Sequence, residues 1–141
     1  MKIWRGRNVA GWLLVLIFLA GALAVEGEGA DPPRQAVLVQ AVVCEGIEAY
    51  EPVNAAIVFS ISLGEVSFFT KFDPVPKETH IFHKWFFRDR LTTRKKLTLK
   101  PPRWATFSRI QLRQADKGPW RVETVDKNGR LIDVRRFSIT D

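Results

Sequence analysis

The chain has 141 residues and a formal net charge of +7, from 22 Lys and Arg against 15 Asp and Glu. Once a leader and a linker are set aside, about 107 residues remain, enough for one domain that buries roughly two-thirds of its unfolded surface. The single cysteine excludes an internal disulfide, so packing alone must hold this domain together.

Residues 1–25 predict a signal peptide or an N-terminal membrane anchor. Three bases precede an apolar run over residues 9–24, and residues 22–24 offer the small-x-small pattern that a signal peptidase accepts. The run is near the upper limit for a signal core and short of the roughly 20 residues that span a bilayer as a helix, so cleavage and an uncleaved anchor both stay open. In either case we expect a periplasmic or extracytoplasmic protein, anchored to the inner membrane through residues 9–24 if the anchor is kept.

Residues 26–35 are interpreted as a linker, because they hold two prolines and two glycines and almost nothing to bury. The folded domain is therefore predicted at residues 36–141. Its cysteine, Cys44, lies too far behind the apolar run to be a lipid-modified anchor. We expect a buried, inert thiol there, with an intermolecular bridge or a redox role as the alternative.

Short segments of residues 36–141 predict strands, because β-branched and apolar residues run together or alternate between turn residues. Asp73–Pro76 and Pro101-Pro102 break the pattern, and Asn128 with Gly129 supplies the positive-φ positions of a tight turn. We expect the strands at residues 36–44, 55–62, 66–72, 78–88, 91–100, 104–113, 120–125 and 131–139, with residues 45–54 as a connection. This pattern predicts an all-β fold, an immunoglobulin-like antiparallel β-sandwich of about seven to eight strands, with a small β-barrel as the alternative.

Five short motifs follow one another along the domain. They are His83-Lys84-Trp85, Trp104–Ser108, Gly118–Val122, Asn128-Gly129 with Leu131, and Phe137. In this order they resemble the bacterial family called domain of unknown function 2914 (DUF2914), over roughly residues 44–139. The resemblance implies an extracytoplasmic bacterial β domain and carries no established activity. It implies structural roles for His83, Trp85, Trp104, Ser108, Gly118, Trp120, Gly129 and Phe137, whereas a role tied to the arginine that commonly stands at the position of Ala105 does not transfer.

The two histidines are candidates for a metal pair. His80 and His83 are three apart, and such side chains on a strand point to opposite faces, so they cannot chelate one ion without a bulge. His83 shares a face with Ile81 and Trp85, which predicts a core histidine whose ring nitrogens are hydrogen-bonded. His80 is then expected near solvent, and no metal site is predicted.

No catalytic or cofactor site is expected either. Ser108 has no visible base, and no Gly-x-Ser-x-Gly, Walker or paired-carboxylate motif occurs. A site that joined Ser108 or Cys44 to His83 would still need an acid. The sequence therefore favours a protein that is not an enzyme.

Trp85, Trp104 and Trp120 are interpreted as core and edge aromatics of the sandwich. The alternative is a platform on which sugar rings stack. That platform would require two of the three rings to be exposed and coplanar.

Charge is distributed unevenly along the domain. Residues 26–51 carry six acids and one base, whereas residues 84–113 carry ten bases and one acid, so one face is expected to be strongly positive. A solvated face that keeps the protein soluble is the simplest explanation. The sharper hypothesis is an anionic partner, namely a lipid headgroup, an acidic glycan or an envelope protein, while nucleic acid conflicts with export. The residues predicted to form this face are Arg90, Arg94, Lys96, Lys100 and Arg109.

Two functions follow from these observations. The first is a non-catalytic binding or interaction module of the cell envelope that uses the basic face. The second is a structural accessory domain, tethered to the membrane by an uncleaved N-terminal helix, whose sheet packs against another subunit.

Overall fold

The computed structural model describes residues 34–141. The predicted signal or anchor over residues 1–25, and the linker apart from its last two residues, lie outside the described residues. Within residues 34–141 no helix is long and apolar enough to cross a membrane.

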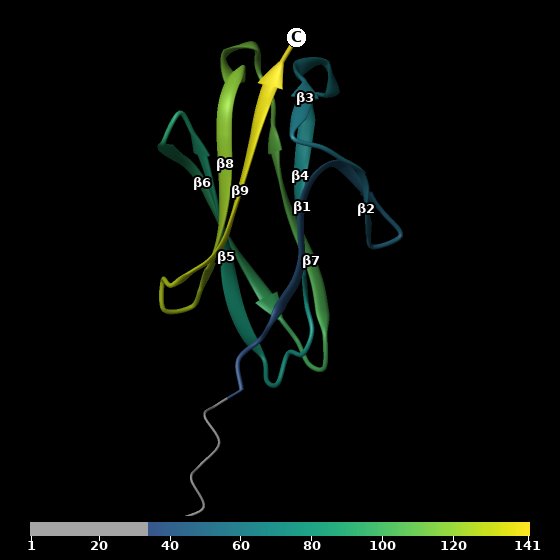
Figure 1. Ribbon diagram of the computed structural model, residues 1–141, viewed down its shortest axis with the longest axis vertical. Coiled ribbons are helices and arrows are strands. Elements are labelled where there is room, and N and C mark those ends of the chain that lie inside the picture. Colours follow the sequence, from purple (N-terminus) through teal and green to yellow (C-terminus); the bar gives the residue numbers. More distant parts are fainter. Residues whose placement is uncertain (1–33) are drawn as a thin grey trace, which may run out of the picture. The chain divides into compact units, whose positions relative to one another are not determined.

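Residues 34–141 form nine strands in two facing sheets (Figure 1). Two short 3-10 helices connect strands along the chain: η1 (Ile61–Leu63) follows β3, and η2 (Gln114–Asp116) follows β7. In chain order the strands are β1 Leu38–Glu48, β2 Glu51–Ala55, β3 Val58–Ser60, β4 Glu65–Phe72, β5 Thr79–Phe87, β6 Arg90–Leu99, β7 Trp104–Gln111, β8 Gly118–Asp126 and β9 Leu131–Thr140. The sheets stay separate, so the predicted β-sandwich is confirmed and the alternative of a closed barrel is wrong.

The strand order is that of an immunoglobulin-like sandwich. One sheet has the order β2-β1-β4-β7 and the other β3-β9-β8-β5-β6. All pairs are antiparallel except β3 with β9. The chain changes sheet on either side of the short strand β3, and again between β4 and β5, between β6 and β7, and between β7 and β8. These crossings place the two sheets face to face across the core.

The prediction of a connection over residues 45–54 is wrong. This stretch holds the end of β1 and most of β2, which pair as a hairpin. Its turn is made by Ala49 and Tyr50, whose φ angles of 48° and 62° lie in the left-handed region. Two-residue hairpin turns need such angles but usually take Asn or Gly there, so the residue types gave no signal.

The core strand predicted over residues 55–62 is mostly absent. The stretch begins with the last residue of β2 and otherwise holds only the three-residue strand β3, and Ile57 and Val58 are exposed. The chain then enters η1, where the Ser60 hydroxyl caps the turn by accepting the backbone N–H of Ser62 at 3.1 Å. Ile57 and Val58 therefore lie at the rim of the sandwich, whereas Phe59 is buried in its main core cluster.

Aromatic rings fill the middle of the sandwich. Phe68 of β4 meets Trp85 of β5 edge to face, and Trp120 of β8 stacks on Phe137 of β9 with ring centroids 6.1 Å apart. Each such burial stabilises the fold by about 1.5–3 kcal/mol. A second, smaller cluster lies toward the end where β1 begins, and its buried members are Phe72, Val75, Ile81 and Leu99.

Candidate functional site

A chain of hydrogen bonds crosses the core between the two sheets. His83 on β5 contacts Thr70 on β4 through Nε2 and Oγ1 at 3.0 Å, and Ser108 on β7 through Nδ1 and Oγ at 2.7 Å. Trp85 donates its indole N–H to the same Ser108 oxygen at 3.1 Å. We call these four residues the polar seam; it confirms the prediction of a core histidine with both ring nitrogens bonded.

The seam corrects the prediction that Ser108 has no base beside it. The base is His83, which is near Ser108 only because β5 and β7 face each other across the core. Burial lowers the pKa of His83 to about 3, so the ring is neutral near pH 7. No carboxylate belongs to the seam, and Thr70 takes the place at Nε2 that an acid would need. The arrangement joins the sheets, and its chemistry is that of a satisfied buried network.

Three of the motif residues, His83, Trp85 and Ser108, belong to the seam itself. Trp120 and Phe137 are buried in the same core cluster as Trp85, while Trp104 lies at the start of β7 and is 37% exposed. The two motif glycines lie in the left-handed half of φ space, Gly118 at 134° and Gly129 at 84°. Trp85 and Trp120 are buried, so the three tryptophans do not form the exposed coplanar pair that a sugar platform requires.

Cys44 is fully buried within β1, where its thiol faces the Ser67 carbonyl oxygen at 3.7 Å. Burial raises the pKa of this thiol, which disfavours the reactive thiolate. Among residues 34–141, no cluster of three or more His, Cys, Asp or Glu side chains is arranged to hold a metal ion.

The predicted basic residues are divided between two sheets. Arg90, Arg94 and Lys96 lie on β6, at the edge of the five-stranded sheet, and Lys100 follows that strand. Arg109 lies on β7 of the other sheet, where it pairs with Glu65 at 3.8 Å. The structure therefore brings Arg94 and Lys96 together on one face and leaves Arg109 on another.

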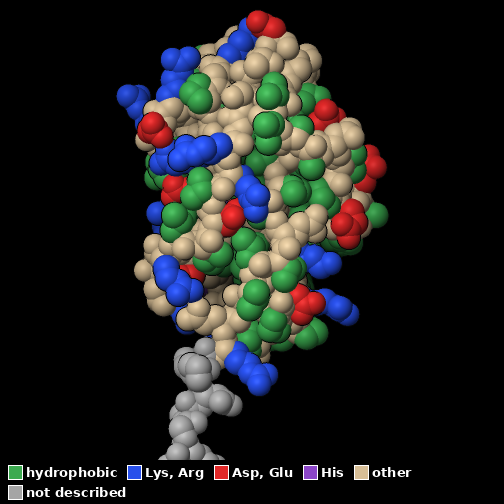
Figure 2. Space-filling view, in the orientation of Figure 1, with side chains coloured by type: hydrophobic (Ala, Val, Ile, Leu, Met, Phe, Trp, Pro, Cys, Tyr) green, Lys and Arg blue, Asp and Glu red, His purple; other side chains and the backbone are tan. Residues whose placement is uncertain are grey.

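Arginine and phenylalanine alternate on the outer face of the five-stranded sheet. The Arg94 guanidinium lies 3.7 Å from the Phe82 ring centroid, and that of Arg121 lies 4.0 Å from the Phe86 centroid. The register places Lys84, Arg94 and Arg136 on the same face. Figure 2 agrees, since Lys and Arg are frequent along the side of β5, β6 and β8, whereas acids gather on the side of β2.

Sequence reasoning missed Arg121 and Arg136. Arg121 lies on β8 and Arg136 on β9, and both follow the basic run at residues 84–113. Arg121 pairs with Phe86 of β5, and Arg136 pairs with Arg121. This register brings both arginines onto the outer face of the sheet. Arg121 is held there by ion pairs with Asp89 and with Glu123.

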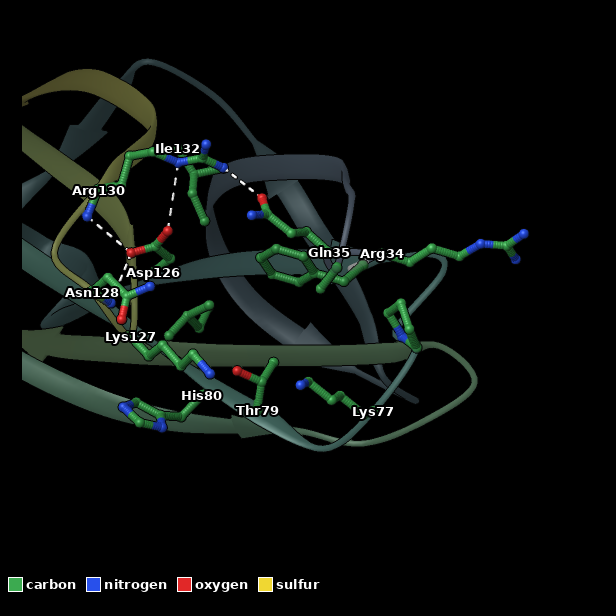
Figure 3. Close-up of a pocket in the computed structure, with 14 residues that line it drawn as sticks. Arg34, Gln35, Lys77, Thr79, His80, Asp126, Lys127, Asn128, Arg130 and Ile132 are labelled. Carbon is green, nitrogen blue, oxygen red and sulfur yellow. Dashed lines mark hydrogen bonds and ion pairs between the residues drawn. The ribbon is translucent and has the colours of Figure 1, made fainter. Parts of the chain in front are cut away.

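A cavity of about 290 Å³ opens at the end of the sandwich where β1 begins (Figure 3). Its walls come from the segment before β1, the start of β5 and the turn between β8 and β9. Apolar residues of the second core cluster form its floor, and bases stand around the rim. The rim bases are Arg34, Lys77, Lys127 and Arg130.

None of these rim bases was predicted as a site residue, and we call the cavity the rim pocket. Lys127 and Arg130 flank Asn128-Gly129, a segment interpreted only as a turn. The sequence holds no signal that would join this turn to residue 34 or to residue 77. The pairing of β8 with β5 brings the turn beside the start of β5, and the hydrogen bond from Arg130 to Gln35 joins it to the segment before β1.

Comparison with known proteins gives a family match over part of the chain and no activity. Residues 78–139 match the model of the family described as "Protein of unknown function (DUF2914)", which confirms the resemblance over that range. No curated protein matches the chain. Among solved structures, it is similar to a beta-glucosidase from Listeria innocua in complex with isofagomine, at 10% identity and a TM-score of 0.41, covering 74% of this chain and 16% of that chain. A likeness at that TM-score carries no argument here.

Proposed function

Starting from the match of residues 78–139 to the DUF2914 family, we propose that this domain is a non-catalytic binding module of the cell envelope. Its binding surface is the outer face of the five-stranded sheet, and its partner is anionic. The observation that carries the proposal is a set of bases on this face that make no ion pair among residues 34–141. These bases are Lys84, Arg94, Lys96 and Arg136.

The geometry of this face favours an acidic glycan over the other anionic partners. The Arg94 guanidinium is held against the Phe82 ring, and such a planar group can bind a carboxylate through two parallel hydrogen bonds. Neighbouring strands of a sheet lie about 4.8 Å apart, so bases on adjacent strands form a row that suits a polymer whose carboxylates recur along its length. The buried seam supports a role without catalysis, because Thr70 rather than an acid meets the second ring nitrogen of His83.

Charge reversal on adjacent residues of β6 tests the proposal. Arg94→Glu places a carboxylate on the outer face, whereas Lys95→Glu changes the charge equally beside it on the opposite side of the strand. With alginate as the probe, we expect Arg94→Glu to weaken binding about tenfold and Lys95→Glu to weaken it less than about threefold. Equal effects of the two variants would overturn the outer face as the binding surface.

The second candidate is a structural accessory domain tethered to the membrane. It is favoured by apolar side chains that stay exposed on one side of the sandwich, with Val39 at 53%, Ile57 at 73% and Val58 at 55%. Such side chains are available to pack against another subunit. Blotting of the native protein tests the tether, because a full-length, membrane-bound species supports it and a shorter soluble species removes it.

A further inference from the structure

The rim pocket has two ammonium groups that converge on one hydroxyl. Figure 3 shows the Lys77 and Lys127 side chains directed toward Thr79, which stands between them at the start of β5. Neither lysine makes an ion pair among residues 34–141. Two like charges directed at one point repel each other, and an anion bound between them removes the repulsion.

The one acid of the rim pocket is already occupied. Asp126 accepts the backbone N–H groups of Asn128 and Arg130 at 2.8 and 2.9 Å, and it pairs with the Arg130 guanidinium at 3.5 Å. Arg130 in turn donates to the Gln35 side chain at 2.8 Å. The Asp126 carboxylate therefore stabilises the turn, and the charge presented to a ligand by the two lysines stays positive.

The floor of the rim pocket is apolar. Phe72 and Ile81 are buried beneath it, and Ala36 and Ile132 are partly buried beside them. A free phosphate ion would use the lysines and leave this floor wet. A molecule that carries hydrocarbon beside its phosphate fills both parts, and a volume of about 290 Å³ is near the lower end for small-molecule sites.

The position of the rim pocket points to a membrane as the source of that molecule. Arg34, the first described residue, lines the cavity, and only residues 25–33 separate it from the predicted membrane segment. Nine extended residues reach about 30 Å at most, so an anchored chain keeps this pocket close to the bilayer surface. In Figure 1 the connection between β6 and β7, which carries Lys100 and Arg103, lies at the same end of the sandwich.

We propose that the rim pocket binds an anionic phospholipid, with the phosphate between Lys77 and Lys127 and the first carbons of an acyl chain on the apolar floor. This inference rests on the proposed envelope function, but the lysines it uses are not among the bases of the β5 and β6 face. If the glycan does not bind to that face, the lipid site can still exist. If the lipid does not bind in the rim pocket, the glycan-binding face can still exist.

Lysine acetylation in the full chain tests the site. The protein is placed in nanodiscs of phosphatidylglycerol or of phosphatidylcholine, and acetylation of each lysine is measured by mass spectrometry. Occupancy by phosphatidylglycerol should lower the acetylation of Lys77 and Lys127 about fivefold, in proportion to the occupied fraction. Lys100 is the internal control, because it lies at the same end and does not line the pocket. Equal protection of all three lysines would show general surface attraction and overturn the proposal.

Two further arms separate the alternatives. Inorganic phosphate added to the phosphatidylcholine discs should leave Lys77 exposed, and full protection by phosphate would overturn the lipid as the ligand. The double variant Lys77→Gln/Lys127→Gln should retain fewer phosphatidylglycerol molecules in native mass spectrometry, whereas Lys100→Gln/Arg103→Gln, which removes the same charge at the same end, should retain the wild-type number. Equal loss in both variants would reduce the effect to net charge and overturn the pocket.

Discussion

The polar seam and the rim pocket place polar side chains in opposite situations. In the seam, His83 and Ser108 are buried and bonded to each other and to their neighbours. In the rim pocket, Lys77 and Lys127 lie near a hydroxyl and have no ion-pair partner among the described residues. Polar groups that satisfy one another hold the two sheets together, and polar groups without partners are the ones available to a ligand.

This comparison also assigns different tests to the two regions. Changes in the seam should alter stability, because they leave buried groups unpaired. Changes in the rim pocket should alter binding and leave stability nearly unchanged, because the groups are solvated. A result of the opposite kind in either region would break the distinction.

The largest expected effect is acid destabilisation through His83. Its pKa is about 3 in the folded state and 6.5 without the fold. Between these values the unfolded chain binds a proton that the folded chain does not, so stability is lost as the pH falls from 6.5 toward 3. The loss is about 1.4 kcal/mol per pH unit and about 4 kcal/mol over the whole window. Unfolding in urea at a series of pH values measures it.

Carboxylates also titrate in this window, so the contribution of His83 needs its own signal. Its ring proton resonance, followed by NMR, should stay at the neutral position down to about pH 4. His80, on the outer face of the same strand, gives the comparison signal in the same spectrum. A His83 resonance that titrates near pH 6.5 would contradict the seam.

Ser108→Ala should produce the next largest effect. It leaves the Trp85 indole N–H and the His83 Nδ1 without their shared partner, and each unpaired buried group costs about 1–3 kcal/mol. We expect a total loss of about 3 kcal/mol in chemical denaturation. Ser67→Ala is the matched control, because Ser67 is equally buried and its hydroxyl has no partner among residues 34–141. That variant should be neutral or more stable, and equal losses would show that burial alone sets the cost.

A smaller contrast is expected between two buried threonines. Thr70 bonds His83 Nε2, whereas the Thr124 hydroxyl has no partner within the described part of the chain. Both side chains are fully buried, and valine has nearly the same shape. Thr70→Val should lose about 2 kcal/mol of stability, and Thr124→Val should lose none or gain up to about 1 kcal/mol. Similar melting temperatures of the two variants would argue against a hydrogen-bonded seam.

Much of the fold could be predicted from the sequence, because strand alternation and turn chemistry are local signals. The seven strands other than β2 and β3 lie close to their predicted positions, and His83 was predicted to be a bonded core residue from its face on β5 alone. The hairpin at Ala49 and Tyr50 was missed because left-handed angles usually favour Gly or Asn.

The functional surfaces could be predicted only in part, because they depend on strand register. A run of bases indicated a positive face, but Arg109 and Arg94 lie on different sheets, and no local pattern reports which sheet a strand joins. Arg121 reaches the face of β5 only through pairing with Phe86. The rim pocket needs three segments that lie more than forty residues apart along the chain, around Arg34, Lys77 and Lys127. Its existence is therefore a property of the tertiary fold.

The smallest expected effect on stability is in the rim pocket. Lys77→Gln/Lys127→Gln removes two exposed charges that repel each other, so the melting temperature should change by less than about 3 °C. The change should be toward higher stability at low salt and should vanish near 1 M salt, where the Debye length is about 3 Å. Thermal unfolding followed by tryptophan fluorescence at the two salt concentrations measures it. A large loss of stability would place these lysines with the structural residues of the seam, and the distinction between the two regions would fail.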